Sequence, residues 1–295
     1  MRITEGEVVF QIYKGILTKM KCINPQKDVT IPHVFPNGEK ITTIKSGFCI
    51  GKYDTITIED GITNILGEAF SCAKVKKVHW NKTCKRIPTL CFRFSDIEEI
   101  ENIDNVENIG SGAFYESDIT TFTVPSNCYK IPDSCFANSQ LKSIYNTKHL
   151  TSIGELAFFK CGLEEFVWPD DCKIIPEACF SRSSLRKITN IQSVEQVDDM
   201  AFYQCYIKDI VWPQNCPKIP YKCFSGSSLE NFSGFENITS IGMEAFSDVG
   251  RITKLDMSKA TIAYIGDMAF WDIDEDKIIL PYYMEREELK RLCYA

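Results

Sequence analysis

The stretch Ser152–Phe180, SIGELAFFKCGLEEFVWPDDCKIIPEACF, holds two successive copies of one pattern and shows how the rest of the chain is built. The copies end in Ile-Gly-x-x-Ala-Phe and Ile-Pro-x-x-Cys-Phe, which place Phe158 and Phe180 22 residues apart. The same step of 22 residues joins ten phenylalanines, and one step of 24 leads to an eleventh: Phe48, Phe70, Phe92, Phe114, Phe136, Phe158, Phe180, Phe202, Phe224, Phe246 and Phe270. A fixed period of this length predicts one supersecondary unit stacked on copies of itself, each completing its neighbour's core.

Two kinds of coil alternate along the chain, so the full repeat is 44 residues long. Downstream of the phenylalanines from Phe48 to Phe224, apolar residues fall at offsets five and eight, as Leu163 and Phe166 do after Phe158. With offset ten, this is the Leu-x-x-Leu-x-Leu core of a leucine-rich repeat, which predicts one short strand per coil. Because strand side chains alternate, offsets eight and ten should face inward and offsets seven and nine should face solvent.

Offset ten itself alternates between large and small residues. Tryptophan fills it in one kind of coil (Trp80, Trp168, Trp212) and asparagine in the other (Asn102, Asn146, Asn190). We expect a single internal ladder in which each indole spreads over smaller neighbours and each asparagine bonds backbone groups. An aromatic ligand cage built from the tryptophans is the alternative interpretation.

Eight of the fourteen cysteines occupy two repeated slots that valine, isoleucine, leucine or alanine fill in the alternate coils. One slot lies at offset fourteen from the phenylalanine (Cys84, Cys128, Cys172, Cys216), and the other directly precedes a phenylalanine (Cys91, Cys135, Cys179, Cys223). This exchange predicts small buried hydrophobic residues, and free thiols of this kind indicate a reducing compartment. Bridges such as Cys84–Cys91 are the alternative. The Cys-x6-Cys spacing and the three histidines do not match a zinc site. The sequence therefore predicts neither a metal site nor a cofactor.

Three features of the repeats carry a family resemblance. They are Ala-Phe-x-x-Cys (Ala157 to Cys161, Ala201 to Cys205), the Trp-Pro dipeptides at the strand ends, and Ile-Gly-x-x-Ala-Phe. Across residues 28–281 the chain resembles the BspA-like, Treponema-type leucine-rich-repeat family. The resemblance implies an open, right-handed, mostly β solenoid with a parallel sheet on one face. It also implies roles in adhesion and protein binding, with no catalytic residues.

The ends of the chain fit caps on such a solenoid. Residues 8–12 and 16–20 predict a β-hairpin around Lys14-Gly15, and Glu285–Leu292 predicts a short helix. We therefore expect an N-terminal β cap with the start of the first coil over residues 1–40, a leucine-rich-repeat solenoid over 41–280 and a C-terminal cap over 281–295. In the absence of a Gly/Ser- or Pro-rich linker, these parts are expected to form one continuous domain.

The net charge and hydropathy of the chain limit the classes of partner that it can bind. The 295 residues carry a net charge of −7, so the chain lacks the basic face that nucleic acid or an anionic membrane would require. The first residues lack the apolar run of a signal peptide, and no window reaches a membrane span. We expect a cytoplasmic monomer that inserts into no membrane, with a cell-surface location as the alternative.

An enzyme is the least favoured function, because no Gly-x-Ser-x-Gly, phosphate loop or His-Glu-x-x-His motif occurs. The paired carboxylates Glu98-Glu99 and Glu164-Glu165 lie one coil from Lys76-Lys77 and Arg186-Lys187, as in a solvated charge ladder. The predicted function is a non-enzymatic protein-binding module or scaffold, with a BspA-type surface adhesin as the alternative. The candidate partner-binding residues are the outward strand positions Lys77, His79, Glu99, Glu101, Tyr145, Glu165, Val167, Lys187, Asp209 and Val211.

Overall fold

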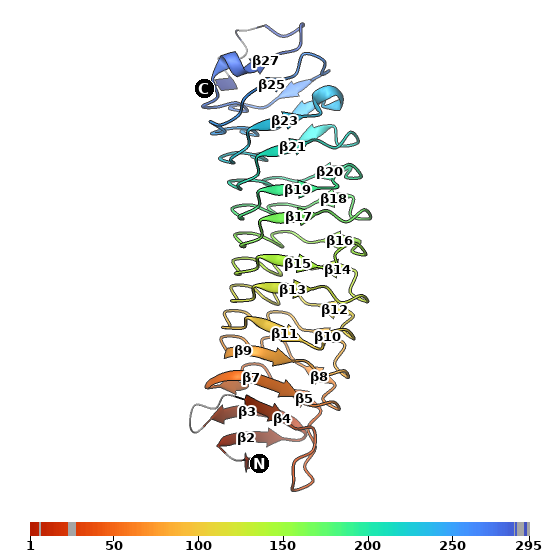
Figure 1. The fold of residues 1–295 in the computed structure, drawn as a ribbon, viewed down its shortest axis with the longest axis vertical. Coiled ribbons are helices and arrows are strands. Elements are labelled where there is room, and N and C mark those ends of the chain that lie inside the picture. Colours follow the sequence, from red (N-terminus) through yellow and green to blue (C-terminus); the bar gives the residue numbers. More distant parts are fainter. Residues whose placement is uncertain (6, 23–27, 286, 288–291, 294–295) are drawn as a thin grey trace. The chain divides into compact units, whose positions relative to one another are not determined.

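The computed structural model describes residues 1–5, 7–22, 28–285, 287 and 292–293 (Figure 1). The chain divides into two compact units, Met1–Asn146 and Thr147–Ala295, and each is described by itself. Both are built from coils that carry a strand of two to seven residues on one side and a two-residue strand on another. The chain is therefore a mostly β solenoid of leucine-rich-repeat type with parallel pairing, as predicted.

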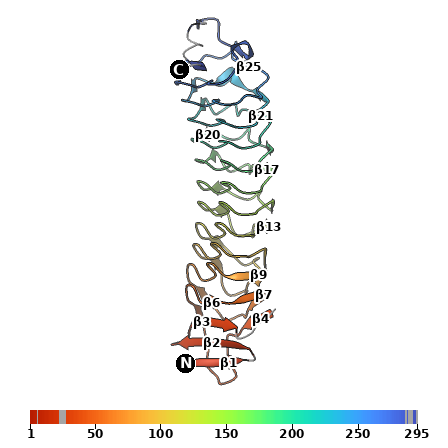
Figure 2. The same cartoon turned by 90° about the vertical axis from the view of Figure 1, so that its left-hand side faces the viewer.

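The first unit begins with an antiparallel cap. Strands β1 (Arg2–Glu5), β2 (Val8–Tyr13) and β3 (Ile16–Cys22) lie side by side (Figure 2). Lys14 and Gly15 both have positive φ, the conformation that a tight hairpin turn requires. The predicted hairpin is confirmed. Strand β3 also pairs in parallel with β5 (Thr43–Ile44) and β6 (Cys49–Ile50), so the cap continues directly into the coils.

The coils of the first unit form two series of strands. The longer strands include a four-stranded parallel sheet in the order β11-β9-β7-β4, followed by the pair β13–β15. Their bounds are β4 (Asp28–Ile31), β7 (Lys52–Ile58), β9 (Lys74–His79), β11 (Glu99–Glu101), β13 (Thr121–Thr123) and β15 (Ser143–Tyr145). The two-residue strands are β8 (Asn64–Ile65), β10 (Arg86–Ile87), β12 (Asn108–Ile109) and β14 (Lys130–Ile131).

The second unit repeats this arrangement with shorter strands. On one side lie β17 (Glu165–Val167), β19 (Lys187–Thr189), β21 (Asp209–Val211), β23 (Asn231–Ser233), β25 (Leu255–Asp256) and β27 (Ile278–Ile279). On another side lie β16 (Ser152–Ile153), β18 (Ile174–Ile175), β20 (Gln196–Val197), β22 (Lys218–Ile219), β24 (Ser240–Ile241) and β26 (Tyr264–Ile265). The 3-10 helices η1 (Phe235–Asn237) and η2 (Glu275–Lys277) interrupt the last coils.

The predicted C-terminal helix falls partly outside the described residues. Glu287, Leu292 and Cys293 are helical, and the side chains of Leu292 and Cys293 are buried. Most of the span predicted as helix lies among the residues that the structure does not describe.

The repeated phenylalanines form the centre of each unit. In the second unit Phe180, Phe202 and Phe224 are fully buried, and their rings stack with centroids 5.9 and 5.4 Å apart. In the first unit Phe92 and Phe114 stack at 5.4 Å. The backbones of neighbouring coils are also hydrogen-bonded at these positions, since the N–H of Phe202 donates to the carbonyl of Cys223 in the next coil. Stacked rings of this kind contribute beyond their buried area, so the phenylalanine column joins coil to coil.

The turn around each phenylalanine uses left-handed backbone that the sequence did not reveal. From Phe70 onward, the residues two before and two after the ring have positive φ, for example Leu156 and Lys160 around Phe158. Most of these residues are not glycine, although this conformation costs an L-residue roughly 1–2 kcal/mol. Most coils therefore contain two strained residues in the phenylalanine turn, and glycine replaces one of them around Phe114 and Phe224.

The structure corrects the prediction of an inward ladder at offset ten. The tryptophans are buried, but Asn102, Asn146 and Asn190 adopt φ of about 60° and expose their side chains. The left-handed conformation turns the asparagine outward, and the following residue, such as Ile191, enters the core instead. The predicted bonds to backbone are confirmed, because Asn190 Nδ2 donates to the carbonyl of Trp168 at 2.8 Å.

The same asparagines coincide with interruptions in the sheet. In the second unit β17 pairs with β19 and β21 pairs with β23, and these pairs are visible in Figure 1. No backbone hydrogen bond joins β19 to β21 in the part of the chain that the structure describes. Asn190 lies directly after β19 and bonds back to the preceding coil, so the sheet ends at each asparagine coil. In the second unit the longer strands thus form a series of parallel pairs.

The cysteine prediction is confirmed for the repeated slots. Both slots are buried in each Ile-Pro-x-x-Cys coil, and no disulfide joins any of the fourteen cysteines. Burial raises the pKa of the Cys161, Cys172 and Cys205 thiols to about 12, which keeps them protonated near neutral pH. Cys72 is exposed.

Candidate protein-binding face

All ten candidate residues lie on the longer strands, at the outward positions. Those of the first unit are on β9, β11 and β15, and those of the second are on β17, β19 and β21. The residues between them point inward, as Phe166 does between Glu165 and Val167. The outward direction of offsets seven and nine is confirmed at these positions.

In the first unit the candidates form a charged cluster. Lys77 Nζ lies 3.2 Å from Glu99 Oε2 and also hydrogen-bonds Glu101 Oε1, and His79 Nδ1 lies 2.9 Å from Glu101 Oε2. The hydrogen bond from Lys77 lowers the pKa of Glu101, and the same bond raises the pKa of Lys77. These four side chains already satisfy one another, which leaves Tyr145, 57% exposed on β15, as the apolar candidate of this unit.

The charge ladder predicted from the paired carboxylates is present within each unit. Lys76 lies 3.6 Å from Glu98, and Arg186 lies 3.7 Å from Glu164 on the neighbouring coil. The side chains are more than half exposed, and ion pairs in that setting stabilise a fold by less than about 1 kcal/mol. The ladder keeps the strand face hydrated and contains no acid–base pair set apart from solvent.

In the second unit the candidates form an apolar strip. Val167 and Val211 are 53% and 59% exposed, and Thr189 lies in register with Val167. Glu165 is in register with Lys187 on the adjacent strand, and Asp209 accepts a hydrogen bond from Asn231 at 2.6 Å. Exposed β-branched side chains within a charged surround have the composition of a binding surface.

A groove of about 540 Å³ opens where β19 and β21 fail to pair. Ile188, Ile191 and Ile210 line it together with Val211, and Arg186, Lys187, Lys208 and Asp209 contribute charges. Gln192 reaches across the groove and donates from Nε2 to the carbonyl of Val211 at 3.1 Å. This groove was not predicted from the sequence. The alternation of tryptophan and asparagine coils was nevertheless a signal that strand pairing is interrupted after each asparagine coil.

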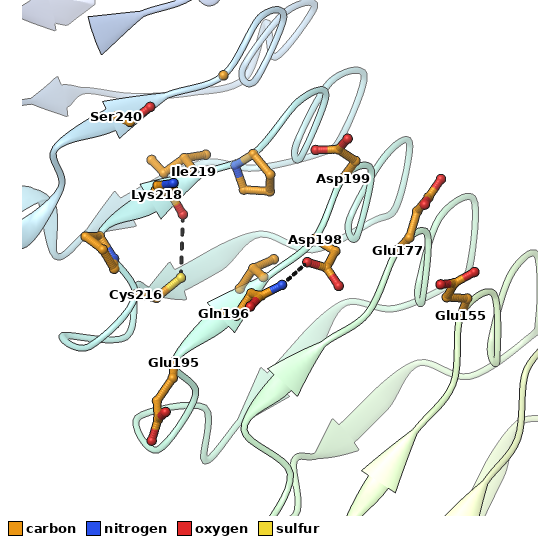
Figure 3. Close-up of a pocket in the computed structure, with 14 residues that line it drawn as sticks. Glu155, Glu177, Glu195, Gln196, Asp198, Asp199, Cys216, Lys218, Ile219 and Ser240 are labelled. Carbon is orange, nitrogen blue, oxygen red and sulfur yellow. Dashed lines mark hydrogen bonds between the residues drawn. The ribbon is translucent and has the colours of Figure 1, made fainter. Parts of the chain in front are cut away.

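A second groove, of about 650 Å³, lies on the side of the two-residue strands (Figure 3). Carboxylates from successive turns, Glu155, Glu177 and Asp199, form a row along it in Figure 3, and Asp198 accepts from Gln196 at 2.6 Å. Sequence reasoning missed this row as well. The signal was available, because the three carboxylates follow Ile-Gly, Ile-Pro and Val-Asp at the step of 22 residues.

Two further observations concern sites of other kinds. Among the residues that the structure describes, no group of three His, Cys, Asp or Glu side chains could hold a metal ion. No described helix is long and apolar enough to cross a membrane.

The stacked coils, the phenylalanine column and the parallel strand pairs define a leucine-rich-repeat protein. Residues 33–142 and 151–277 match the BspA type leucine rich repeat region, in six copies. The chain belongs to that family. The match covers most of the chain and confirms the resemblance seen in the repeats.

Solved structures share the fold at low sequence identity. A leucine-rich repeat protein from Bacteroides ovatus is 18% identical, with a TM-score of 0.53 and 92% of each chain covered. The pneumococcal vaccine antigen PcpA is 18% identical, with a TM-score of 0.60 over 92% of this chain and 79% of its own. A leucine rich cell surface protein from Faecalibacterium prausnitzii is 17% identical, with a TM-score of 0.51 over 100% and 98%. No curated protein matches the chain in sequence.

Proposed function

We propose that the protein is a non-enzymatic binding module that holds another protein on the outward face of β17, β19, β21 and β23. The observation that carries the proposal is the exposure of Val167 and Val211 at alternate coils of one strand face. Nearby charges pair with one another, Arg186 with Glu164 and Lys208 with Glu230, and the valines are the apolar contacts among them. Anchors of this kind supply most of the energy of a protein interface.

The cellular location of the module is a separate proposal with two alternatives, a cytoplasmic scaffold and a surface adhesin. Free, buried thiols fit a reducing compartment, which supports a cytoplasmic scaffold. The family and two structurally similar proteins, a cell surface protein and a vaccine antigen, support a surface adhesin. Protease accessibility on intact cells of the native source separates the two forms. Digestion of the protein on unbroken cells supports the adhesin, and protection until lysis supports the scaffold.

The binding proposal is tested by site-specific photo-crosslinking in the native cells. A benzophenone amino acid placed at Val167 or Val211 should give a defined crosslinked protein, identified by mass spectrometry. The matched control is Ile174, which is exposed (46%) on β18, away from the proposed face. Substituting Val167→Asp and Val211→Asp together should remove capture of the identified partner. Equal crosslinking from Ile174, or capture that survives the double substitution, would overturn the proposal.

A further inference from the structure

The groove between β19 and β21 exposes backbone donors that the strand ladder leaves without partners. The carbonyl of Val211 accepts from Gln192, which places this residue's polar groups on the β19 side of β21. The N–H of Val211 points to the same side, and so does that of Asp209 two residues earlier. Within the described residues, β19 offers these two N–H groups no backbone acceptor. Unmet backbone donors at a strand edge are sites for an incoming acceptor.

The charges around the groove favour an anionic acceptor. Its lining contains three cationic side chains and one carboxylate, in a chain whose net charge is −7. Arg186 and Lys208 are held at the rim by Glu164 and Glu230, at 3.7 and 3.0 Å. Lys187 takes part in no ion pair among the residues that the structure describes. Asp209 is engaged by Asn231, so Lys187 is the cation available to a ligand.

The floor of the groove favours an extended aliphatic segment on either side of that charge. Ile188, Ile191 and Ile210 form the apolar base, and Val211 continues it onto the open strand face. A segment in β conformation presents alternate side chains to one surface. Its aliphatic residues can cover Val211 and Val167 while an acidic residue between them enters the groove.

We propose that the β19–β21 groove binds an extended protein segment that carries an acidic side chain flanked by aliphatic residues. The carboxylate accepts hydrogen bonds from the N–H groups of Asp209 and Val211 and pairs with Lys187. Charge-assisted hydrogen bonds of this type are the strong ones in protein recognition. The inference rests on the proposed function, since it names the chemistry of the partner at the same face.

The test uses the full-length protein and fluorescent, end-blocked peptides. One peptide alternates valine with glutamate, and its control alternates valine with lysine. Fluorescence anisotropy at low ionic strength should show tight binding of the Val-Glu peptide and weaker binding of Val-Lys. Lys187→Glu should weaken the Val-Glu complex about tenfold, and added salt should weaken it as well. The matched control Lys173→Glu, an exposed lysine of the same unit outside the groove, should leave it unchanged.

A second variant distinguishes a specific effect on binding from a loss of folding, because it is expected to strengthen the complex. Asp209→Asn keeps a hydrogen-bonding partner for Asn231 and removes the one carboxylate of the lining, so it should tighten the Val-Glu complex several-fold. Equal binding of both peptides, or insensitivity to Lys187→Glu and Asp209→Asn, would overturn the inference. If crosslinks form at Val167 and Val211 but the Val-Glu peptide does not bind, the binding module stands and the acidic segment is wrong. If no crosslinks form at all, the proposed function itself fails.

Discussion

Trp168 donates from Nε1 to the carbonyl of Cys172 at 2.7 Å, and this bond recurs in every tryptophan coil of the repeat. Trp80 bonds Cys84 at 3.0 Å and Trp212 bonds Cys216 at 2.8 Å. The carbonyl lies where the chain leaves the strand and turns towards the two-residue strand. Tryptophan and the offset-fourteen cysteine are therefore linked structurally, and the indole is a structural element rather than part of a ligand cage.

Trp168→Phe should lower the free energy of unfolding by about 1–3 kcal/mol, because the carbonyl of Cys172 loses a buried hydrogen bond. Urea denaturation followed by circular dichroism measures the change. The matched control is Val124→Ile, since valine occupies the tryptophan slot in its own coil and donates no such bond. A loss no larger than that of the control would contradict the structural role of the indole.

Glycine should stabilise the left-handed positions of the phenylalanine turns. Glu116 has a φ of 49° and is exposed. There, Glu116→Gly should exceed Glu116→Ala in stability by about 1 kcal/mol, because glycine adopts this conformation without strain. Glu107, an exposed residue outside the positive-φ set, is the control, and at this position the alanine variant should be the more stable. The same order at both positions would show that the turn imposes no strain.

Asp256 should contribute an acid-dependent part of the stability. Ser258 donates from Oγ at 2.6 Å and Lys254 lies 2.9 Å away, and these partners lower the pKa of Asp256 to about 2. The folded pKa lies below that of the unfolded chain, about 3.9. The contribution is therefore complete above about pH 5 and declines as the pH falls towards about 2. Asp256→Asn should reduce the loss of stability between these pH values, as measured by thermal melting, and an unchanged acid slope would contradict the assignment.

Native thiol reactivity should follow burial. At about pH 8, iodoacetamide should modify Cys72 first, because it is exposed. The eleven buried cysteines should react only as the protein unfolds, since burial holds thiols such as Cys205 protonated. Intact mass spectrometry over time counts the additions, and Cys72→Ser should remove the fast phase. Early modification of several cysteines at once would contradict the buried-core account.

Much of the fold was predictable because each structural constraint recurs in every coil. The step from Phe158 to Phe180 predicted the stacked unit, and the exchange of Cys179 with alanine predicted its burial. The prediction that failed concerned local backbone geometry. Asn190 occupies an inward position by strict alternation, yet its left-handed φ turns it out of the core and coincides with a break in the sheet. Residue type alone does not reveal this conformation, because asparagine adopts both the extended and the left-handed backbone conformation.

The candidate face was predictable in position but incomplete in chemistry. Strand alternation identified Val167 and Val211 as outward. The groove beside them was not predicted, because it depends on the missing pairing between β19 and β21, which the alternation of coils signals but does not specify. The acidic row from Glu155 to Asp199 was present in the repeat, but each of its residues occupies a turn position that polar side chains commonly fill.

The pairing of strands also fixes the length by which such a chain can grow or shrink. In the second unit a tryptophan coil shares its ladder bonds with the asparagine coil after it, whereas the next coil is joined to this pair through the phenylalanine turns. Inserting or removing 44 residues there would join two like surfaces and leave the ladders of the remaining pairs intact. A change of 22 would set two coils of one kind against each other. The natural module for duplication, and for engineering longer or shorter versions, is therefore the coil pair.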